Sequence, residues 1–162
     1  MHKLTTSMFI ALFFTLLTYT FSFASHAKVF TEQQLTELAN KFVDAKNTKQ
    51  QPNTSVQDID NYIALLAENF VDEHLKYNVI VTDKGELRKS MIAKMKDKVI
   101  VSNIEINELM LGSNVVFIKM TETGKVKPSH LDKVIEYTST NIVSLEFNDA
   151  GLINHIRRHH GF

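Results

Sequence analysis

The residues best suited to chemistry lie at the carboxyl end of the chain, where residues 154–160 read Asn-His-Ile-Arg-Arg-His-His. Two of these histidines, His155 and His159, would share one face of a helix, as zinc ligands do. The segment follows a tight turn and is expected to be a strand, on which the two histidines would lie roughly 13 Å apart. Zinc ligands lie about 2 Å from their ion. We therefore predict no metal site and no cofactor.

The alternative role for this tail is to bind an anion in a pocket. His155, Arg157 and His159 share one parity of a strand, and an arginine fork can bind a carboxylate through two hydrogen bonds. If this parity faces inward, the three side chains would hold an anionic or carbonyl-bearing ligand, and Glu146 would pair with Arg157 in the empty protein. If it faces outward, they form a solvated or dimer-interface stripe. Each of the two faces of this strand carries one isoleucine, so hydropathy does not decide between the inward and the outward orientation.

Acid–base catalysis would need a carboxylate near the substrate and a donor opposite it. The acids expected on strands and the tyrosine donors are Asp72, Glu73, Glu136, Glu146, Tyr62, Tyr77 and Tyr137. No spacing marks a pair among them. His74 lies beside Glu73, but neighbours on a strand face opposite ways. The sequence therefore favours binding over catalysis, with Tyr137 and Glu146 as further ligand-binding candidates.

The first 27 residues have the form of a secretory signal peptide. Lys3 precedes an apolar run over residues 8–17, no acidic residue occurs before Glu32, and residues 25–27, Ser-His-Ala, fit the small-x-small cleavage pattern. An uncut membrane anchor is the alternative, but the strongly apolar run is short for a span of about 20 residues. We expect cleavage and a periplasmic or secreted protein, with no membrane contact afterwards.

Residues 28–162 are expected to form a single domain. The chain contains 18 basic and 18 acidic residues, a formal net charge of zero. A near-neutral domain lacks the basic surface that nucleic acid or an anionic membrane requires. There is no cysteine, which excludes disulfides, thiol catalysis and thiolate metal sites.

Helix signals dominate the first half of this domain. Residues 31–34 have capping-box form, Thr followed three residues later by Gln, and apolar residues recur at helical spacing as far as Asn47. A second helix is predicted over residues 55–70, with Ser55 as its N-cap. A third begins at Asp83. A short extended segment is expected over residues 74–82, between the second and third helices.

Strand signals dominate the second half. Alternating apolar residues predict strands over 99–111, 115–121 and 134–147, the last as one strand or two abutting pieces. Residues 122–132 are polar and are expected to form a long exposed loop. A tight turn at 148–151 precedes the last strand, 152–160. Helices grouped early and strands late indicate an α+β domain with helices on one face of a mostly antiparallel sheet.

This order of elements resembles the nuclear transport factor 2-like superfamily, and within it the polyketide-cyclase-like (SnoaL-like) and ketosteroid-isomerase-like small domains. The resemblance covers residues 31–162 and rests on residues 42–45 (Phe-Val-Asp-Ala), 63–72, 85–87 (Gly-Glu-Leu) and the closing hairpin at 147–153. In the hairpin, Ala150 stands between Asp149 and Gly151, where the family has Asp-Gly, and we expect a bulge there.

The resemblance implies a curved sheet wrapped around three helices as a cone with a pocket, and a homodimer formed through the outer face of the sheet. It does not imply one activity, because members include isomerases, cyclases, dehydratases, hydrolases, accessory subunits and binding modules. The isomerase Asp and Tyr cannot be placed on this sequence. The leading hypothesis is an exported domain that binds a small, partly apolar or anionic ligand. An acid–base enzyme using His155 or an acid near Asp72 is the alternative, and a structural or accessory dimer subunit is the second.

Overall fold

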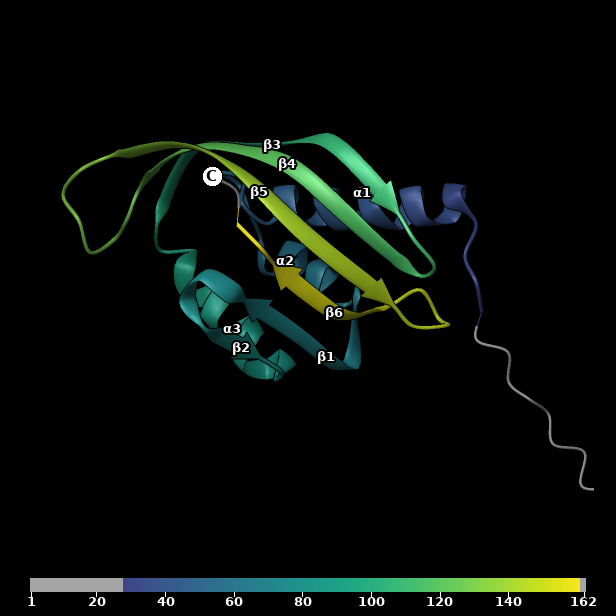
Figure 1. The fold of residues 1–162 in the computed structure, drawn as a ribbon. Helices are drawn as coiled ribbons and strands as arrows, with labels where there is room; N and C mark the ends of the chain where they lie inside the picture. Colours follow the sequence, from purple (N-terminus) through teal and green to yellow (C-terminus); the bar gives the residue numbers. More distant parts are fainter. Residues whose placement is uncertain (1–27, 161–162) are drawn as a thin grey trace, which may run out of the picture.

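The computed structural model describes residues 28–160 (Figure 1). Its helices are α1 (Glu32–Thr48), α2 (Val56–Ile63) and α3 (Lys84–Lys94), and its strands are β1 (Leu66–His74), β2 (Val79–Val81), β3 (Lys98–Leu111), β4 (Val115–Lys127), β5 (Ile135–Phe147) and β6 (Ile153–Arg158). A 3-10 turn, Leu75–Tyr77, joins β1 to β2. The expected signal peptide, residues 1–27, lies outside the described residues. No helix among the described residues is long and apolar enough to cross a membrane.

The starts of the three helices are fixed by local hydrogen bonds, as the sequence predicted. The Thr31 hydroxyl accepts from the Gln34 amide at 3.2 Å, and the Gln34 side chain accepts from the Thr31 amide at 3.0 Å. Ser55 and Asp58 form the same reciprocal pair at α2, and the Asp83 carboxylate caps α3. Each cap satisfies amides that have no partner within the first turn of a helix.

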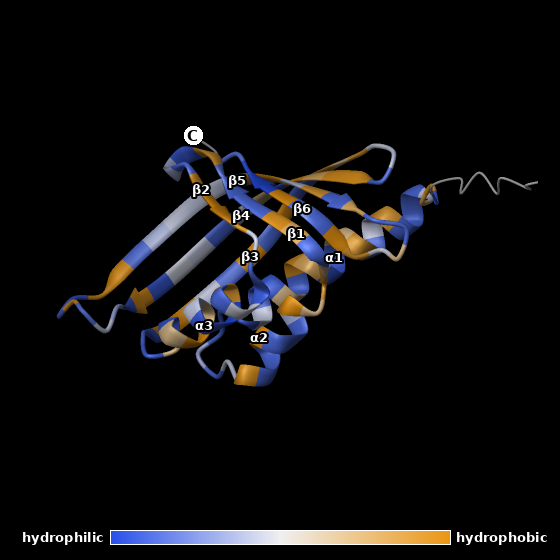
Figure 2. Cartoon of the chain, turned by 90° about the horizontal axis from the view of Figure 1, so that it is seen from below, coloured by the Kyte–Doolittle hydropathy of each residue, from blue (hydrophilic) through white to orange (hydrophobic). Residues whose placement is uncertain are grey.

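The sheet has six strands in the order β2-β1-β6-β5-β4-β3. β1 and β6 are parallel, and every other pair is antiparallel. Figure 2 shows the three helices on one side of this sheet. The β4–β5 hairpin curves beyond the helices (Figure 1). The predicted fold class, three helices on a curved and mostly antiparallel sheet, is confirmed.

The core lies between the helices and the inner face of the sheet. Side chains that are fully buried there include Phe42 of α1, Tyr62 of α2, Phe70 of β1, Ile118 of β4 and Ile156 of β6. The Phe42 and Tyr62 rings pack with their centroids 5.8 Å apart. This packing fixes the inner wall of the cone and the direction in which neighbouring polar side chains point.

Two predicted element boundaries are wrong. The second helix was expected to reach residue 70, but α2 ends at Ile63 and β1 begins at Leu66. The apolar residues of 63–70 fit either structure, and pairing with β6 decides, since the Ile153 amide donates to the Leu65 carbonyl. The loop expected over residues 122–132 is shorter, because β4 continues to Lys127 in pairing with both β3 and β5.

The closing hairpin contains a bulge, but it lies at Asn154 in β6, whereas the sequence placed it at Ala150 in the turn. Phe147 pairs with Ile153 whereas Glu146 pairs with His155, so Asn154 is the extra residue. Gly151 in the turn has a φ of 77°, a value that glycine adopts without strain. The bulge turns both Ile153 and Ile156 to the buried side, although strict alternation would place them on opposite faces.

Candidate ligand-binding cavity

A cavity of about 540 Å³ opens between the helices and the inner face of the sheet. Part of its wall is apolar and comes from Ile59, Leu87, Met91, Met95, Val99 and Val126. The polar part comes from Lys46, Lys49, Asp72, His74, Lys94 and Arg158, with Tyr137. A cavity of this size with an apolar body and a few polar groups is typical of sites for small organic ligands.

Arg158 and Asp72 form a bidentate ion pair in this wall. The Nε and Nη2 atoms of Arg158 donate to the two carboxylate oxygens of Asp72, both at 2.8 Å. Arg158 Nη2 also donates to the Tyr62 hydroxyl at 3.3 Å. The side chains of Arg158 and Asp72 are only 14% and 2% exposed. Although burial opposes the charge, the contacts with Tyr62 and Asp72 raise the pKa of Arg158, so the guanidinium in the cavity wall stays charged.

Lys46 is the second buried cation of the wall. Its Nζ lies 2.6 Å from Glu122 Oε1, and both side chains are nearly inaccessible. Burial lowers the pKa of Lys46, and the Glu122 carboxylate opposes that change. Glu122 in turn accepts from the Asn141 amide at 3.0 Å. Lys46 is therefore neutralised within the protein.

Lys49 differs from Arg158 and Lys46, because its partner is an aromatic ring. Its Nζ lies 4.7 Å from the centroid of the Tyr62 ring, and it forms no ion pair with any carboxylate of residues 28–160. Burial lowers the pKa of Lys49 to about 7, with further contributions from the charges of Lys46, Arg158 and Lys94. The amine can therefore exist in both protonation states near neutral pH.

His74 and Tyr137 complete the polar lining. His74 Nε2 lies 3.6 Å from Asp72 Oδ1, and its pKa is lowered by burial and by Arg158. Tyr137 crosses β4 at Gly124, where an added Cβ would lie 2.6 Å from the phenol ring. Burial and then the charge of Glu122 raise the pKa of Tyr137, so the phenol stays neutral. Gly124 therefore leaves room for the close approach of this ring.

The residues predicted for the site are divided between two faces of the sheet. Tyr137 lines the cavity. His155 lies beside Glu73 and Glu146 at 3.3 and 3.7 Å, and Arg157 donates to Glu73 at 2.7 Å rather than to Glu146. None of His155, Arg157 and Glu146 lines the cavity, whose arginine is Arg158.

His159, the remaining candidate, also lies away from the cavity lining. Its Nε2 is 3.2 Å from the Ser144 hydroxyl, and its ring centroid is 6.3 Å from that of Phe117. Of residues 154–160, the cavity lining therefore contains Arg158. His155 and Arg157 lie beside Glu73 instead, and His159 lies beside Ser144. Any ligand-binding role of His155, Arg157, His159 and Glu146 stays a prediction.

Three cavity residues, Lys46, Lys49 and Arg158, were not singled out from the sequence. A signal exists for the two lysines. The buried stripe of α1 runs through Leu35, Ala39 and Phe42, and Lys46 and Lys49 continue it at steps of four and three residues. A cation in the line of a core-facing stripe indicates either a buried pair or a ligand site.

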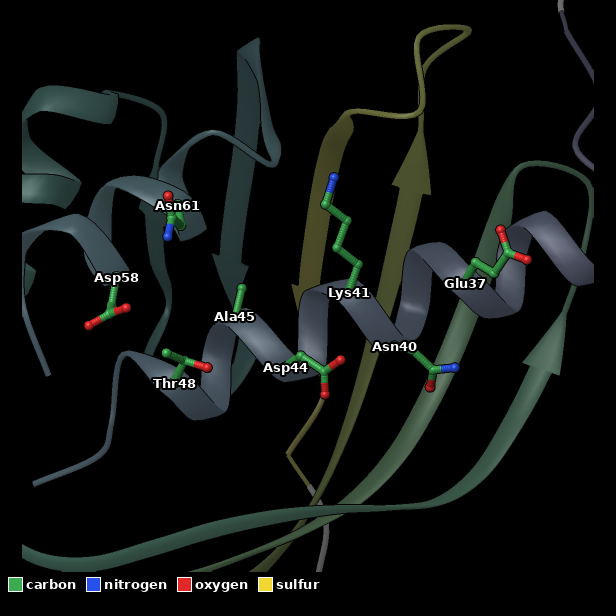
Figure 3. A pocket seen from close by; sticks show the side chains of 8 residues that line it. All are labelled: Glu37, Asn40, Lys41, Asp44, Ala45, Thr48, Asp58 and Asn61. Carbon is green, nitrogen blue, oxygen red and sulfur yellow. The ribbon is translucent and has the colours of Figure 1, made fainter. Parts of the chain in front are cut away.

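A second hollow, of about 450 Å³, lies between α1 and α2 (Figure 3). Its charged side chains are Glu37, Lys41, Asp44 and Asp58. Asp58 already serves as a cap, since it accepts from the Ser55 amide at 2.8 Å. This hollow has no apolar wall comparable to that of the cavity, so we place the candidate site in the cone.

Comparisons with known proteins identify the architecture. No family model matches the sequence, and no curated protein matches it significantly. Solved structures do match. A protein assigned to the SnoaL-like polyketide cyclases, from Shewanella putrefaciens CN-32, has a TM-score of 0.64 at 14% identity, covering 80% of both chains. An M. tuberculosis LEH-like epoxide hydrolase has a TM-score of 0.58 at 13% identity, covering 80% of this chain and 84% of that one.

An NTF-2 like protein from Burkholderia xenovorans LB400 matches with a TM-score of 0.55 at 12% identity, covering 80% of this chain and 84% of that one. These likenesses extend over most of the domain, and they agree with the element order, the curved sheet and the cavity between sheet and helices. The chain has the nuclear transport factor 2-like fold, of the kind found in SnoaL-like and ketosteroid-isomerase-like proteins.

Proposed function

We propose that the cone binds a small amphipathic anion, such as a carboxylate joined to an apolar body. The observation that carries this proposal is the Lys49 amine on the cavity wall, which no carboxylate of residues 28–160 neutralises when it is protonated. A buried charge is costly unless it is paired. An anionic ligand would supply the missing partner.

The other charges of the wall support an anion rather than a cation. Arg158 and Lys46 are each paired with a carboxylate, so the negative charges of Asp72 and Glu122 are already matched. Lys94, an exposed residue of the lining, adds a further cation. Asp97, also in the lining, accepts from the Ser129 backbone amide at 2.8 Å. The apolar wall from α2, α3 and β3 would contact the body of the ligand.

Calorimetry with octanoate and 1-octanol tests this proposal, because the two share an apolar chain and differ in charge. Octanoate should bind at least about tenfold more tightly, a difference of about 1.4 kcal/mol. Lys49→Met should remove most of that preference. Lys41→Met, on an exposed part of α1, is the matched control and should leave it unchanged. Equal affinity for both probes, or no binding of either, would contradict the proposal.

A general acid–base enzyme is the second candidate, and His74 is the observation that favours it. Its lowered pKa keeps the imidazole neutral, and therefore basic, at neutral pH. Similar structures include an epoxide hydrolase and a protein assigned as a ketosteroid isomerase. The test is exchange of α-hydrogens of a small ketone in D2O, followed by NMR. Exchange that is lost in His74→Gln but kept in Lys49→Met would support this role over simple binding.

We also propose that the protein is a homodimer formed through the outer face of the sheet. Met110, Phe117 and Ile142 expose 62%, 36% and 36% of their surface there, and an exposed apolar face favours a partner. Light scattering should give twice the monomer mass for residues 28–162, and Phe117→Glu should shift it to the monomer. A wild-type monomer at high micromolar concentration would contradict this.

Export is the last part of the proposal. It is supported by Lys3, the apolar run over residues 8–17 and the small residues Ser25 and Ala27. Mass spectrometry of protein from a periplasmic or culture fraction should find a new terminus at Ser25 or Lys28. An intact Met1 terminus in the membrane fraction would indicate an anchor instead.

A further inference from the structure

Lys49 is placed where an amine can meet a ligand. It caps the carboxyl end of α1, with its backbone amide bonded to the Ala45 and Asn47 carbonyls, so its starting point is fixed by the helix. Its side chain is half-buried on the cavity wall and passes over the face of Tyr62. Tyr62 is fully buried and its hydroxyl is held by Arg158, so the ring beneath the amine is held in place.

The surroundings of Lys49 disfavour its protonated form. Lys46 on α1, Lys94 on α3 and Arg158 on β6 all contribute positive charge, and the nearby carboxylates, Glu122 on β4 and Asp72 on β1, are bound to Lys46 and Arg158. Desolvation first, and then the positive charges of Lys46, Arg158 and Lys94, lower the pKa of Lys49 from 10.5 to about 7. Desolvation and a neighbouring cation are the conditions that make a lysine nucleophilic at neutral pH.

We propose that Lys49 is a nucleophilic lysine that forms a reversible imine with the carbonyl group of the ligand, an aldehyde or ketone with an apolar body. This deepens the proposed function, since it rests on the same cavity binding a ligand, and an oxo acid would satisfy both. The other lysines of the lining fit the role less well. Lys46 is held by Glu122 at 2.6 Å, and Lys94 is exposed.

The reaction needs no oxidant, reductant or metal. The lone pair of the neutral Lys49 amine attacks the carbonyl carbon, a C–N bond forms, and the carbonyl π electrons move to oxygen. A proton passes from nitrogen to that oxygen to give a carbinolamine. Loss of the oxygen as water, after a second protonation, leaves the C=N bond, and hydrolysis reverses every step. His74 lines the same cavity, and its neutral imidazole could carry these protons.

Reductive trapping on the wild-type protein tests the imine directly. The protein is incubated at pH 7 with 8-oxooctanoate, or with octanal, and sodium cyanoborohydride, which reduces an imine to a stable secondary amine. Peptide mapping should place the adduct on Lys49 at least about tenfold above Lys41, because Lys41 is exposed and lies outside the cavity, where no bound ligand is held against it. Excess octanoate should suppress the Lys49 adduct and leave that on Lys41 unchanged.

A second measurement does not depend on any ligand. Trace labelling with acetic anhydride at pH 7 should modify Lys49 about tenfold faster than Lys41, and Lys49→Arg should remove that fast site without altering the fold, as judged by circular dichroism. Octanoate binding with no selective adduct and no fast labelling would overturn this inference and leave the anion proposal standing. Selective trapping on Lys49 without octanoate binding would overturn the anion proposal and leave the nucleophilic lysine standing.

Discussion

Arg157 and Arg158 are adjacent in the sequence but lie in very different environments. Each belongs to β6, and each pairs with an acid of the parallel strand β1. Arg157 donates to Glu73 at 2.7 Å on the outer face, where their side chains are 44% and 23% exposed. Arg158 donates to Asp72 at 2.8 Å on the inner face, where the corresponding values are 14% and 2%.

The two ion pairs have the same chemistry but differ in their effect on stability, because one is exposed to water and the other is not. Water can replace either partner of the outer pair, so such a pair adds little to the free energy of unfolding. Water cannot replace the partners of the inner pair, so loss of one leaves an uncompensated buried charge. The inner pair also lines the cavity whereas the outer pair does not. The same two residue types therefore serve the ligand site on one face and the surface on the other.

The largest effect should come from Arg158→Met. It leaves Asp72 buried without its bidentate partner, and we expect the free energy of unfolding in urea to fall by about 3–5 kcal/mol. The double variant Asp72→Leu/Arg158→Met should recover much of this loss, because an apolar pair of similar size leaves no buried charge. Equal losses for Arg158→Met and Arg157→Met would show that the two faces do not differ.

The next effect concerns the pH dependence of stability. The pKa of Lys49 is about 7 in the folded protein and near 10.5 when unfolded, so the unfolded state binds more protons between these values and stability rises with pH. From pH 7 to 9 the wild type should gain about 2 kcal/mol relative to Lys49→Met. The exposed lysine variant Lys41→Met should show no such difference. A pH-independent difference for Lys49→Met would contradict the lowered pKa.

A smaller effect is expected at the third partner of the inner pair. Tyr62→Phe keeps the ring under Lys49 but removes the hydroxyl that accepts from Arg158 Nη2 at 3.3 Å. We expect a loss of about 1 kcal/mol, as for one buried hydrogen bond, measured by urea denaturation. A loss as large as that of Arg158→Met would mean that the hydroxyl, and not Asp72, is the main partner.

The smallest effect should be that of Arg157→Met on the outer face, within about 0.5 kcal/mol. Arg157 holds the pKa of Glu73 below its usual value through a hydrogen bond. Any contribution of this contact is present at neutral pH and is lost as the pH falls through that lowered pKa. NMR titration of the Glu73 carboxyl should show a higher pKa in the variant. An unchanged pKa would show that the contact does not form in solution.

The parts of the fold that could be predicted from the sequence are those with local causes. The caps at Thr31, Ser55 and Asp83 need only neighbouring residues, and the turn at 148–151 needs Asn148 and Gly151. The end of the second helix could not be predicted in this way. Residues 66–70 suit a helix or a strand, and the choice depends on pairing with β6, more than 80 residues further along the chain.

For the cavity, the sequence by itself determined which side chains are available, including adjacent arginines on the last strand and adjacent acids at positions 72 and 73. Only the tertiary structure decided that Arg158 and Asp72 face the cavity while Arg157 and Glu73 face outward. The physical reason is an irregularity in each strand, the bulge at Asn154 in β6 and the shift of register between Leu66 and Val71 in β1. One extra residue reverses the alternation along a strand, and whether that residue is accommodated depends on packing between strands rather than on the residues themselves.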